Sequence, residues 1–205
     1  MIDIFSEILK NVLTALYESF WLSALLSVLF MFTWLYAREH DWKESVKIWL
    51  SEFKESSGFR RLFLLALYTM MILFRTLLNR NLWMNPLSDV MGGWWLWKES
   101  NGEMVLTTEP IENVMLFIPF TILLLWTVSS DKKRKERLPG GSVRLIAVLW
   151  LSVKTTFLFS ISIEFLQLFL RLGTWQVSDC VYNTLGGFLG GLIYWVGCRI
   201  SGMLR

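Results

Sequence analysis

Residues 160–191, SISIEFLQLFLRLGTWQVSDCVYNTLGGFLGG, decide the fold of this chain. An apolar segment is followed by a short polar turn and a second apolar segment, which predicts two antiparallel helices. Polar side chains recur along the first helix at i, i+4, i+7 and i+11, so they share one face. These residues are Ser160, Glu164, Gln167 and Arg171. The second helix repeats the spacing with Asp179, Asn183, Gly186 and Gly190.

These polar faces are candidate functional residues, because ionisable side chains are costly inside a membrane segment. The spacings Gly186-xxx-Gly190 and Gly187-xxx-Gly191 allow a neighbouring helix to approach closely. We expect the polar face of the last helix to meet the helix formed by residues 146–170. Five side chains then converge just below one membrane surface: Glu164, Gln167, Arg171, Asp179 and Asn183.

The composition indicates a membrane protein, since 54% of the 205 residues are hydrophobic. Segments of roughly 17 to 25 apolar residues can span a bilayer. The chain contains five, at residues 20–37, 62–78, 114–130, 146–170 and 181–198. We therefore predict an all-α, multi-pass protein of the cell membrane, with residues 1–205 forming one membrane domain.

Basic residues are concentrated in two of the connections between these segments. The first connection contains Arg38, Lys43, Lys47, Lys54, Arg60 and Arg61, and the second contains Lys132, Lys133, Arg134, Lys135, Arg137 and Arg144. The positive-inside rule places both connections in the cytoplasm, with the N-terminus outside and the C-terminus inside. Within the first connection, residues 42–56 predict an amphipathic helix on the inner membrane surface. Contacts with anionic lipids explain the basic runs, and we expect no nucleic-acid partner.

Further polar residues belong to the outer side in this topology: Arg75, Arg80, Asn81, Asn85 and Asn113. Either arginine could extend to lipid phosphates, or the pair could clamp an anion, since guanidinium groups bind anions bidentately. Tryptophans in the outer connection, residues 87–108, predict that it lies on the membrane face as a short lid. The sequence leaves open whether the polar residues of the outer side bind a ligand or only pair with one another, Arg171 with Asp179 and Glu164 with Asn183.

The residues present restrict the chemistry of the outer side. The one histidine, His40, belongs to the cytoplasmic side, so we expect no histidine base, no metal site and no cofactor there. The sequence contains no P-loop, no GxSxG motif and no dinucleotide fingerprint. A catalytic role therefore stays open only for Glu164 or Asp179, as a general base or nucleophile.

Three blocks of sequence resemble the VanZ-like family, which is named for a teicoplanin-resistance protein, across about residues 75–194. They are Glu112-Asn113-Val-Met-Leu-Phe117-Ile-Pro119-Phe120, Ser162-Ile-Glu164-Phe-Leu-Gln167 with Arg171, and Ser178-Asp179-Cys-Val-Tyr-Asn183-Thr184-Leu-Gly186-Gly187-Phe-Leu-Gly190. The resemblance implies glycopeptide or lipoglycopeptide resistance that acts at the membrane without changing the cell-wall target.

Residues and resemblance together predict an amphiphile-binding membrane protein. The expected ligand is a lipoglycopeptide or a lipid-linked cell-wall precursor, held in a polar pocket at the outer leaflet among membrane lipids. The predicted binding residues are Arg75, Arg80, Asn81, Asn113, Glu164, Gln167, Arg171, Asp179 and Asn183. Two other functions stay open: an enzyme that modifies a lipid-linked substrate, and a structural or partner-binding subunit of unknown oligomeric state.

Overall fold

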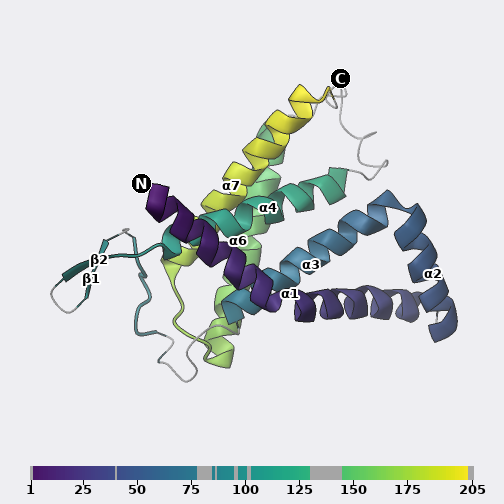
Figure 1. Cartoon of the computed structure of the whole chain (residues 1–205), viewed down its shortest axis with the longest axis horizontal. Helices are drawn as coiled ribbons and strands as arrows, with labels where there is room; N and C mark the ends of the chain where they lie inside the picture. The colour runs from purple at the N-terminus through teal and green to yellow at the C-terminus, as the bar shows by residue number, and fades with distance from the viewer. Residues whose placement is uncertain are drawn as a thin grey trace.

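The protein is a bundle of long helices with one small hairpin (Figure 1). The computed structural model describes residues 2–39, 41–77, 85, 87–94, 97–100, 103–129 and 145–202. The helices are α1 (Ile2–Glu39), α2 (Trp42–Glu55), α3 (Ser57–Leu77), α4 (Glu109–Ser129), α6 (Leu145–Leu170) and α7 (Val177–Ile200). Strands β1 (Trp97–Ser100) and β2 (Glu103–Leu106) pair antiparallel. The helical class is therefore confirmed, with a hairpin that the sequence analysis did not include.

Four of these helices are long and apolar enough to cross a membrane: α1, α3, α4 and α6. The expected fifth, α7, is not among those that meet this measure in the described part of the chain. Its four clustered glycines, at 186, 187, 190 and 191, add little hydropathy. A fifth span at α7, like the orientation of the bundle, therefore stays a prediction.

The first helix is longer than expected. The sequence analysis began its first span at residue 20, but α1 is helical from Ile2 onward and includes a 34-residue span from Phe5 to Arg38. Figure 1 shows α1 changing direction partway along its length. Serines in the helix donate to backbone carbonyls one turn earlier, Ser19 to Ala15 and Ser27 to Ser23. Such back-bonding often bends helices.

The predicted amphipathic helix is present as α2. Its N-terminus is capped by the carboxylate of Asp41, which accepts a hydrogen bond from the backbone N–H of Lys43 at 3.0 Å. Trp49 and Phe53 pack against the end of α1 and the start of α3. The other apolar side chains of the predicted face are exposed: Trp42, Val46 and Leu50. The face is thus divided between a protein contact and an uncovered stripe.

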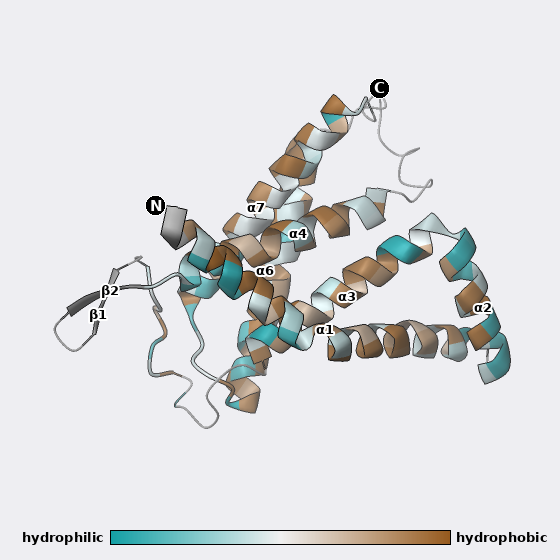
Figure 2. Ribbon diagram, viewed as in Figure 1, coloured by the Kyte–Doolittle hydropathy of each residue, from teal (hydrophilic) through white to brown (hydrophobic). Residues whose placement is uncertain are grey.

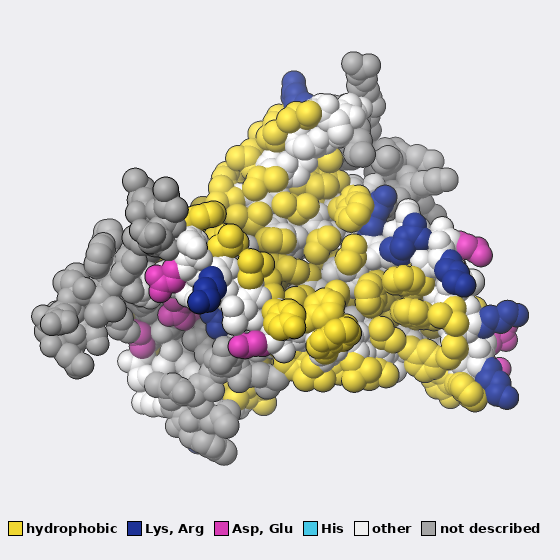
Figure 3. Space-filling view, viewed as in Figure 1, with side chains coloured by type: hydrophobic (Ala, Val, Ile, Leu, Met, Phe, Trp, Pro, Cys, Tyr) yellow, Lys and Arg dark blue, Asp and Glu magenta, His cyan; other side chains and the backbone are white. Residues whose placement is uncertain are grey.

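The surface of the bundle is apolar, as a lipid-facing protein requires. Large hydrophobic side chains are exposed along α1, α6 and α7, and Ile146 and Ile200 are more than four-fifths exposed. The second half of α1 is mostly hydrophobic, whereas α2 alternates between hydrophilic and hydrophobic residues (Figure 2). On the face in Figure 3, lysines and arginines gather around α2, beside a broad hydrophobic area.

Residues of α1, α3, α4 and α6 form the hydrophobic core, and α7 packs closely against both α4 and α6. A Cβ at Gly186 would lie 2.4 Å from the carbonyl oxygen of Val114, and one at Gly190 would lie 2.6 Å from that of Ile118. Only a glycine permits so close an approach to the backbone of α4. On the α6 side, Gly187 and Gly191 lie against the side chains of Thr156 and Ser152 in the same way. The Gly186–Gly190 face therefore meets α4, and not the 146–170 helix as expected.

Candidate functional site

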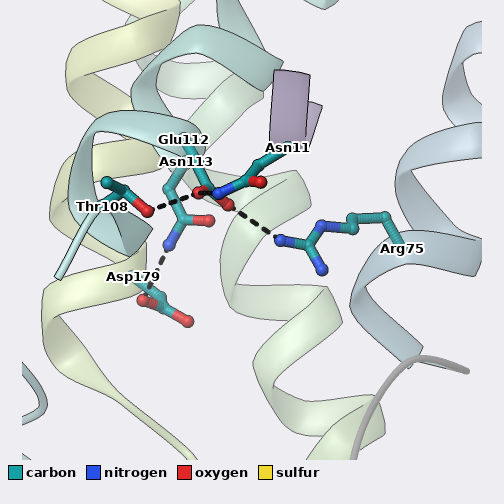
Figure 4. Close-up of polar contacts among 6 residues, drawn as sticks. All are labelled: Asn11, Arg75, Thr108, Glu112, Asn113 and Asp179. Atoms are coloured by element: carbon teal, nitrogen blue, oxygen red, sulfur yellow. Dashed lines mark hydrogen bonds and ion pairs between the residues drawn. The ribbon is translucent and has the colours of Figure 1, made fainter. Parts of the chain in front are cut away.

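The first turn of α4 connects buried polar groups from three other helices (Figure 4). Glu112 and Asn113 are adjacent in the chain, so their side chains leave the helix in different directions. Glu112 faces α1 and α3, whereas Asn113 faces α7. This turn therefore separates the contacts of Glu112 from the Asn113–Asp179 pair.

The first cluster, the Glu112 cluster, consists of Asn11, Arg75, Thr108 and Glu112. The Glu112 carboxylate is 5% exposed and accepts hydrogen bonds from all three of its neighbours. Asn11 Nδ2 donates to it at 3.0 Å, Thr108 Oγ1 at 2.6 Å, and Arg75 Nη2 forms an ion pair at 2.9 Å. The cluster thereby joins α1, α3 and α4 through one neutralised carboxylate.

The sequence analysis placed Arg75 among the ligand-binding residues and did not include Asn11, Thr108 or Glu112. In the structure, Nη2 of the Arg75 guanidinium forms an ion pair with Glu112. In the sequence analysis, Glu112 appeared only as the first residue of a block that carries the family resemblance. A better signal was available, because an arginine near the end of one membrane helix favours a carboxylate at the same depth on a neighbouring helix.

The Asp179 carboxylate lies on the other side of α4. Asn113 Nδ2 donates to Asp179 Oδ1 at 2.9 Å, and both side chains are at least partly buried (Figure 4). This contact joins α4 to the first turn of α7, next to the close approach at Gly186. It replaces the pairing of Asp179 with Arg171 that the sequence left open.

Arg171 lies elsewhere because α6 ends at Leu170. Arg171 has a backbone φ of 53°, so the chain has already left the helix and the i+11 spacing no longer applies. Its side chain is exposed, and it forms no ion pair with another residue that the structure describes. Arg80 and Asn81, the other predicted binding residues of the outer side, lie outside the described residues.

The second cluster, the Glu164 column, runs along the buried face of α6. It consists of Ser160, Glu164, Gln167, Gln176 and Asn183. Glu164 is 2% exposed, and its Oε2 accepts a hydrogen bond from the backbone N–H of Gln176 at 2.7 Å. One turn deeper, Asn183 Nδ2 donates to Ser160 Oγ at 2.8 Å. Glu164 therefore does not use Asn183 as its partner, the second pairing left open by the sequence.

Gln167 forms the outer part of the column. It is 1% exposed, and its Nε2 donates to the carbonyl oxygen of Thr76 at the end of α3, at 2.7 Å. Cys180 of α7 is buried next to Asp179 in the chain, and its thiol lies close to Ser160 of the column. The structure thus brings together most of the residues predicted from the two polar faces.

Two oxygens of the column have no hydrogen-bond partner in the part of the chain that the structure describes. They are Gln167 Oε1 and Asn183 Oδ1, and both are buried. A buried carbonyl oxygen without a donor costs free energy, by about 1–3 kcal/mol. The column therefore contains a surplus of hydrogen-bond acceptors, unlike the Glu112 cluster, where donors surround the carboxylate.

Residues 87–94, which we call the strap, lie over the loop that joins α6 to α7. Asp89 Oδ2 accepts from Gln176 Nε2 at 3.1 Å, and the Val177 N–H donates to the carbonyl of Val90 at 2.9 Å. Gly92 has a φ of 71° and lies so close to Ser178 that a Cβ would overlap its hydroxyl. The strap is thus attached to the same Gln176 whose backbone binds Glu164.

The side-chain atoms that these clusters present determine what they can bind. Among the described residues, no three histidine, cysteine, aspartate or glutamate side chains gather where they could hold a metal ion. The column offers carboxylate, amide and hydroxyl oxygens in a site from which water is excluded. Such a site can bind a donor group or accept a proton.

Comparisons with known proteins match this chain to one family over most of its length. The VanZ/LLP1 family model matches residues 20–199, which extends beyond the region that carried the resemblance in the sequence. Protein VanZ of Enterococcus faecium is 31% identical over 86 residues, which cover 42% of this chain and 44% of that protein. This alignment thus spans less than half of the relative. No solved structure gave a significant match.

Proposed function

Because the chain belongs to the VanZ/LLP1 family, we propose that it confers resistance to teicoplanin-type glycopeptides by binding an amphiphile at the outer membrane leaflet. The amphiphile is either the acylated antibiotic or a lipid-linked cell-wall precursor. Binding to the antibiotic would retain it at the membrane, and binding to the precursor would keep it from the antibiotic. Either route protects the cell without altering the cell-wall target.

The observation that carries the proposal is the Glu164 column. A carboxylate that is 2% exposed and two buried amide oxygens without donors lie in a bundle whose outer surface is apolar. Intramembrane polar groups are rare and cost free energy, so a surplus of them favours a binding role. A purely structural contact would instead satisfy each member, as the Glu112 cluster does.

The placement at the outer leaflet rests on the distribution of charge. Basic residues flank α2, the helix whose Trp42, Val46 and Leu50 are exposed and suited to a membrane interface. The strap and the Glu164 column lie at the opposite ends of α3 and α6, so they belong to the outer side if α2 is inside. A cysteine at Ser56 should be protected from an impermeant thiol reagent in intact cells, and one at Ser100 should react. Labelling at Ser56 instead would move the column to the cytoplasmic side.

A catalytic role is the second candidate, and one observation favours it. Cys180 interacts with both Glu164 and Asp179, so the two carboxylates share a buried neighbour. Two carboxylates in different environments can serve as an acid and a base. An enzyme built on them would act on a lipid-linked substrate at the same position in the bundle.

Two measurements test these candidates. Expression of the chain in a susceptible bacterium should raise the teicoplanin concentration that stops growth, and an unchanged value would contradict the resistance function. The purified protein is then incubated with radiolabelled teicoplanin and with a radiolabelled lipid-linked wall precursor. Retention of either compound in unchanged form supports binding, whereas conversion to a new product supports the enzyme.

A further inference from the structure

Two adjacent arginines in the first turns of α3 differ in what their side chains bind. Arg60 Nη1 donates to the carbonyl oxygens of Phe53 and Lys54, at 3.1 and 2.7 Å, and so caps the last turn of α2. The Arg61 side chain makes no hydrogen bond or ion pair with a residue that the structure describes, and its Nε is buried without an acceptor. One guanidinium therefore serves the fold, whereas the hydrogen-bond donors of the other are unused.

A tryptophan fixes the position of Arg61. The guanidinium carbon Cζ lies 4.7 Å from the centre of the Trp126 ring, in the last turn of α4, and Trp126 is 40% exposed. This contact is made through the charge of the guanidinium and supplies no oxygen to its N–H groups. The Arg61 side chain is only half-buried, so a ligand can approach it from the surface of the bundle. The contact thus holds a cation in place and leaves its donors for another group.

The ligand that fits such a group is an oxyanion of a membrane surface. A guanidinium has five N–H donors and no acceptor, and its planar fork matches the oxygens of a phosphate. Arg61 is the fifth residue of α3, about 6 Å along the helix from its first residue. Lysines and arginines gather around α2, which is joined to this end of α3 (Figure 3). An arginine and a tryptophan this close to the end of a membrane helix lie at the level of the lipid head groups.

We propose that Arg61, held over Trp126, binds the phosphate group of an anionic lipid in the leaflet next to α2. The sequence analysis expected the basic connections to contact anionic lipids in general, and this inference assigns one lipid phosphate to one arginine. Arg60 takes no part, because its Nη1 is engaged by the end of α2. The inference does not depend on the proposed function, since the Glu164 column contacts the other end of α3, at Thr76.

The test compares three probes on the full-length protein in detergent. Dioleoyl phosphatidic acid carries a phosphate on two acyl chains, dioleoylglycerol has the same chains without the phosphate, and inorganic phosphate has no chains. Native mass spectrometry counts the bound lipid. Phosphatidic acid should bind at least about tenfold more tightly than dioleoylglycerol, and an excess of inorganic phosphate should not displace it. Equal binding of the two lipids, or displacement by inorganic phosphate, would overturn the assignment of a lipid phosphate.

Variants of the two adjacent arginines connect the binding to one guanidinium. Arg61→Gln should weaken the binding of phosphatidic acid at least about tenfold. Arg60→Gln is the matched control, because it removes the same charge one residue away, and it should change the binding less than about threefold. Equal losses in the two variants would show that the lipid responds only to the overall charge, and an Arg61→Gln variant that binds as the wild type does would exclude the site.

Melting in detergent shows whether each variant is folded. If Arg61→Gln does not fold, Arg61→Lys takes its place in the comparison. Lysine keeps the positive charge but has no planar fork, so the binding of phosphatidic acid should weaken by about threefold or more. Wild-type affinity in Arg61→Lys would contradict a site built for a guanidinium.

Discussion

Among the described residues, two buried glutamates have similar exposure and different hydrogen-bonding neighbours. Glu112 is 5% exposed and accepts hydrogen bonds from Asn11, Arg75 and Thr108. Glu164 is 2% exposed, accepts from the backbone of Gln176, and lies among amide oxygens that lack donors. The first carboxylate connects helices, and under the proposed function the second receives a ligand.

Position in the fold agrees with this distinction. Two of the donors to Glu112 come from α1 and α3, which are far from α4 in the sequence, and the third, Thr108, lies one turn before Glu112. The α6–α7 hairpin that carries the Glu164 column is held independently, by the glycine contacts of α7 with both neighbours. The column also joins α6 to α3 through Gln167 and to α7 through Asn183, so the groups that it can spare for a ligand are the two oxygens without a described donor.

The largest loss of stability should follow removal of the Glu112 carboxylate. Glu112→Ala leaves the Arg75 cation and two further donors without their acceptor. Breaking a buried ion pair typically costs 3–5 kcal/mol, and we expect about 3 kcal/mol because Arg75 is 28% exposed. Thermal melting in detergent measures the effect, with Glu7→Ala, an exposed acid of α1, as the control. A normal melting temperature for Glu112→Ala would remove the distinction between the two glutamates.

The next largest effect should come from the glycine contacts that place both clusters. Gly186→Ala puts a methyl group 2.4 Å from the carbonyl oxygen of Val114, so α4 and α7 must separate. Overpacking of this kind costs about 1–3 kcal/mol. Gly197→Ala on the same helix has open space around its Cβ and should be neutral or slightly stabilising. Equal melting temperatures for the two variants would show that the α4–α7 contact does not set the position of the clusters.

Much of the Glu164 column could be predicted from the sequence, because helical spacing places Ser160, Glu164 and Gln167 on one face. The same spacing failed at Arg171, where the helix had ended and the backbone turned to a positive φ. It also could not say which neighbour the glycine face of α7 meets, since periodicity identifies a face and not its partner. That information depends on contacts between distant segments.

The Glu112 cluster shows the same limit more strongly. Asn11 and Glu112 are separated by 101 positions in the chain, and no local pattern connects them. The β-hairpin is different, because the sequence contains its signal. An Asn-Gly pair at 101–102 stands between β1 and β2, and this dipeptide favours tight hairpin turns.

A smaller effect is expected at the strap. Asp89→Ala removes the acceptor of Gln176 Nε2 and of the Gly92 N–H, which should cost about 1 kcal/mol. The change should be local, with faster amide hydrogen exchange in residues 87–94 and 174–177 and a nearly unchanged melting temperature. The control is Leu87→Ala, an exposed strap residue outside this network. Faster exchange throughout the bundle would show that the strap supports the fold and does not merely cover the column.

The most direct test of the account is resistance measured for Glu164→Gln at matched protein levels. Glutamine keeps an acceptor for the Gln176 N–H. The free energy of unfolding should therefore lie within about 0.5 kcal/mol of the wild-type value. The account predicts a protein that reaches the membrane, melts normally and confers no teicoplanin resistance. A Glu164→Gln variant that accumulates normally and still protects the cell would contradict the assignment of Glu164 as the functional carboxylate.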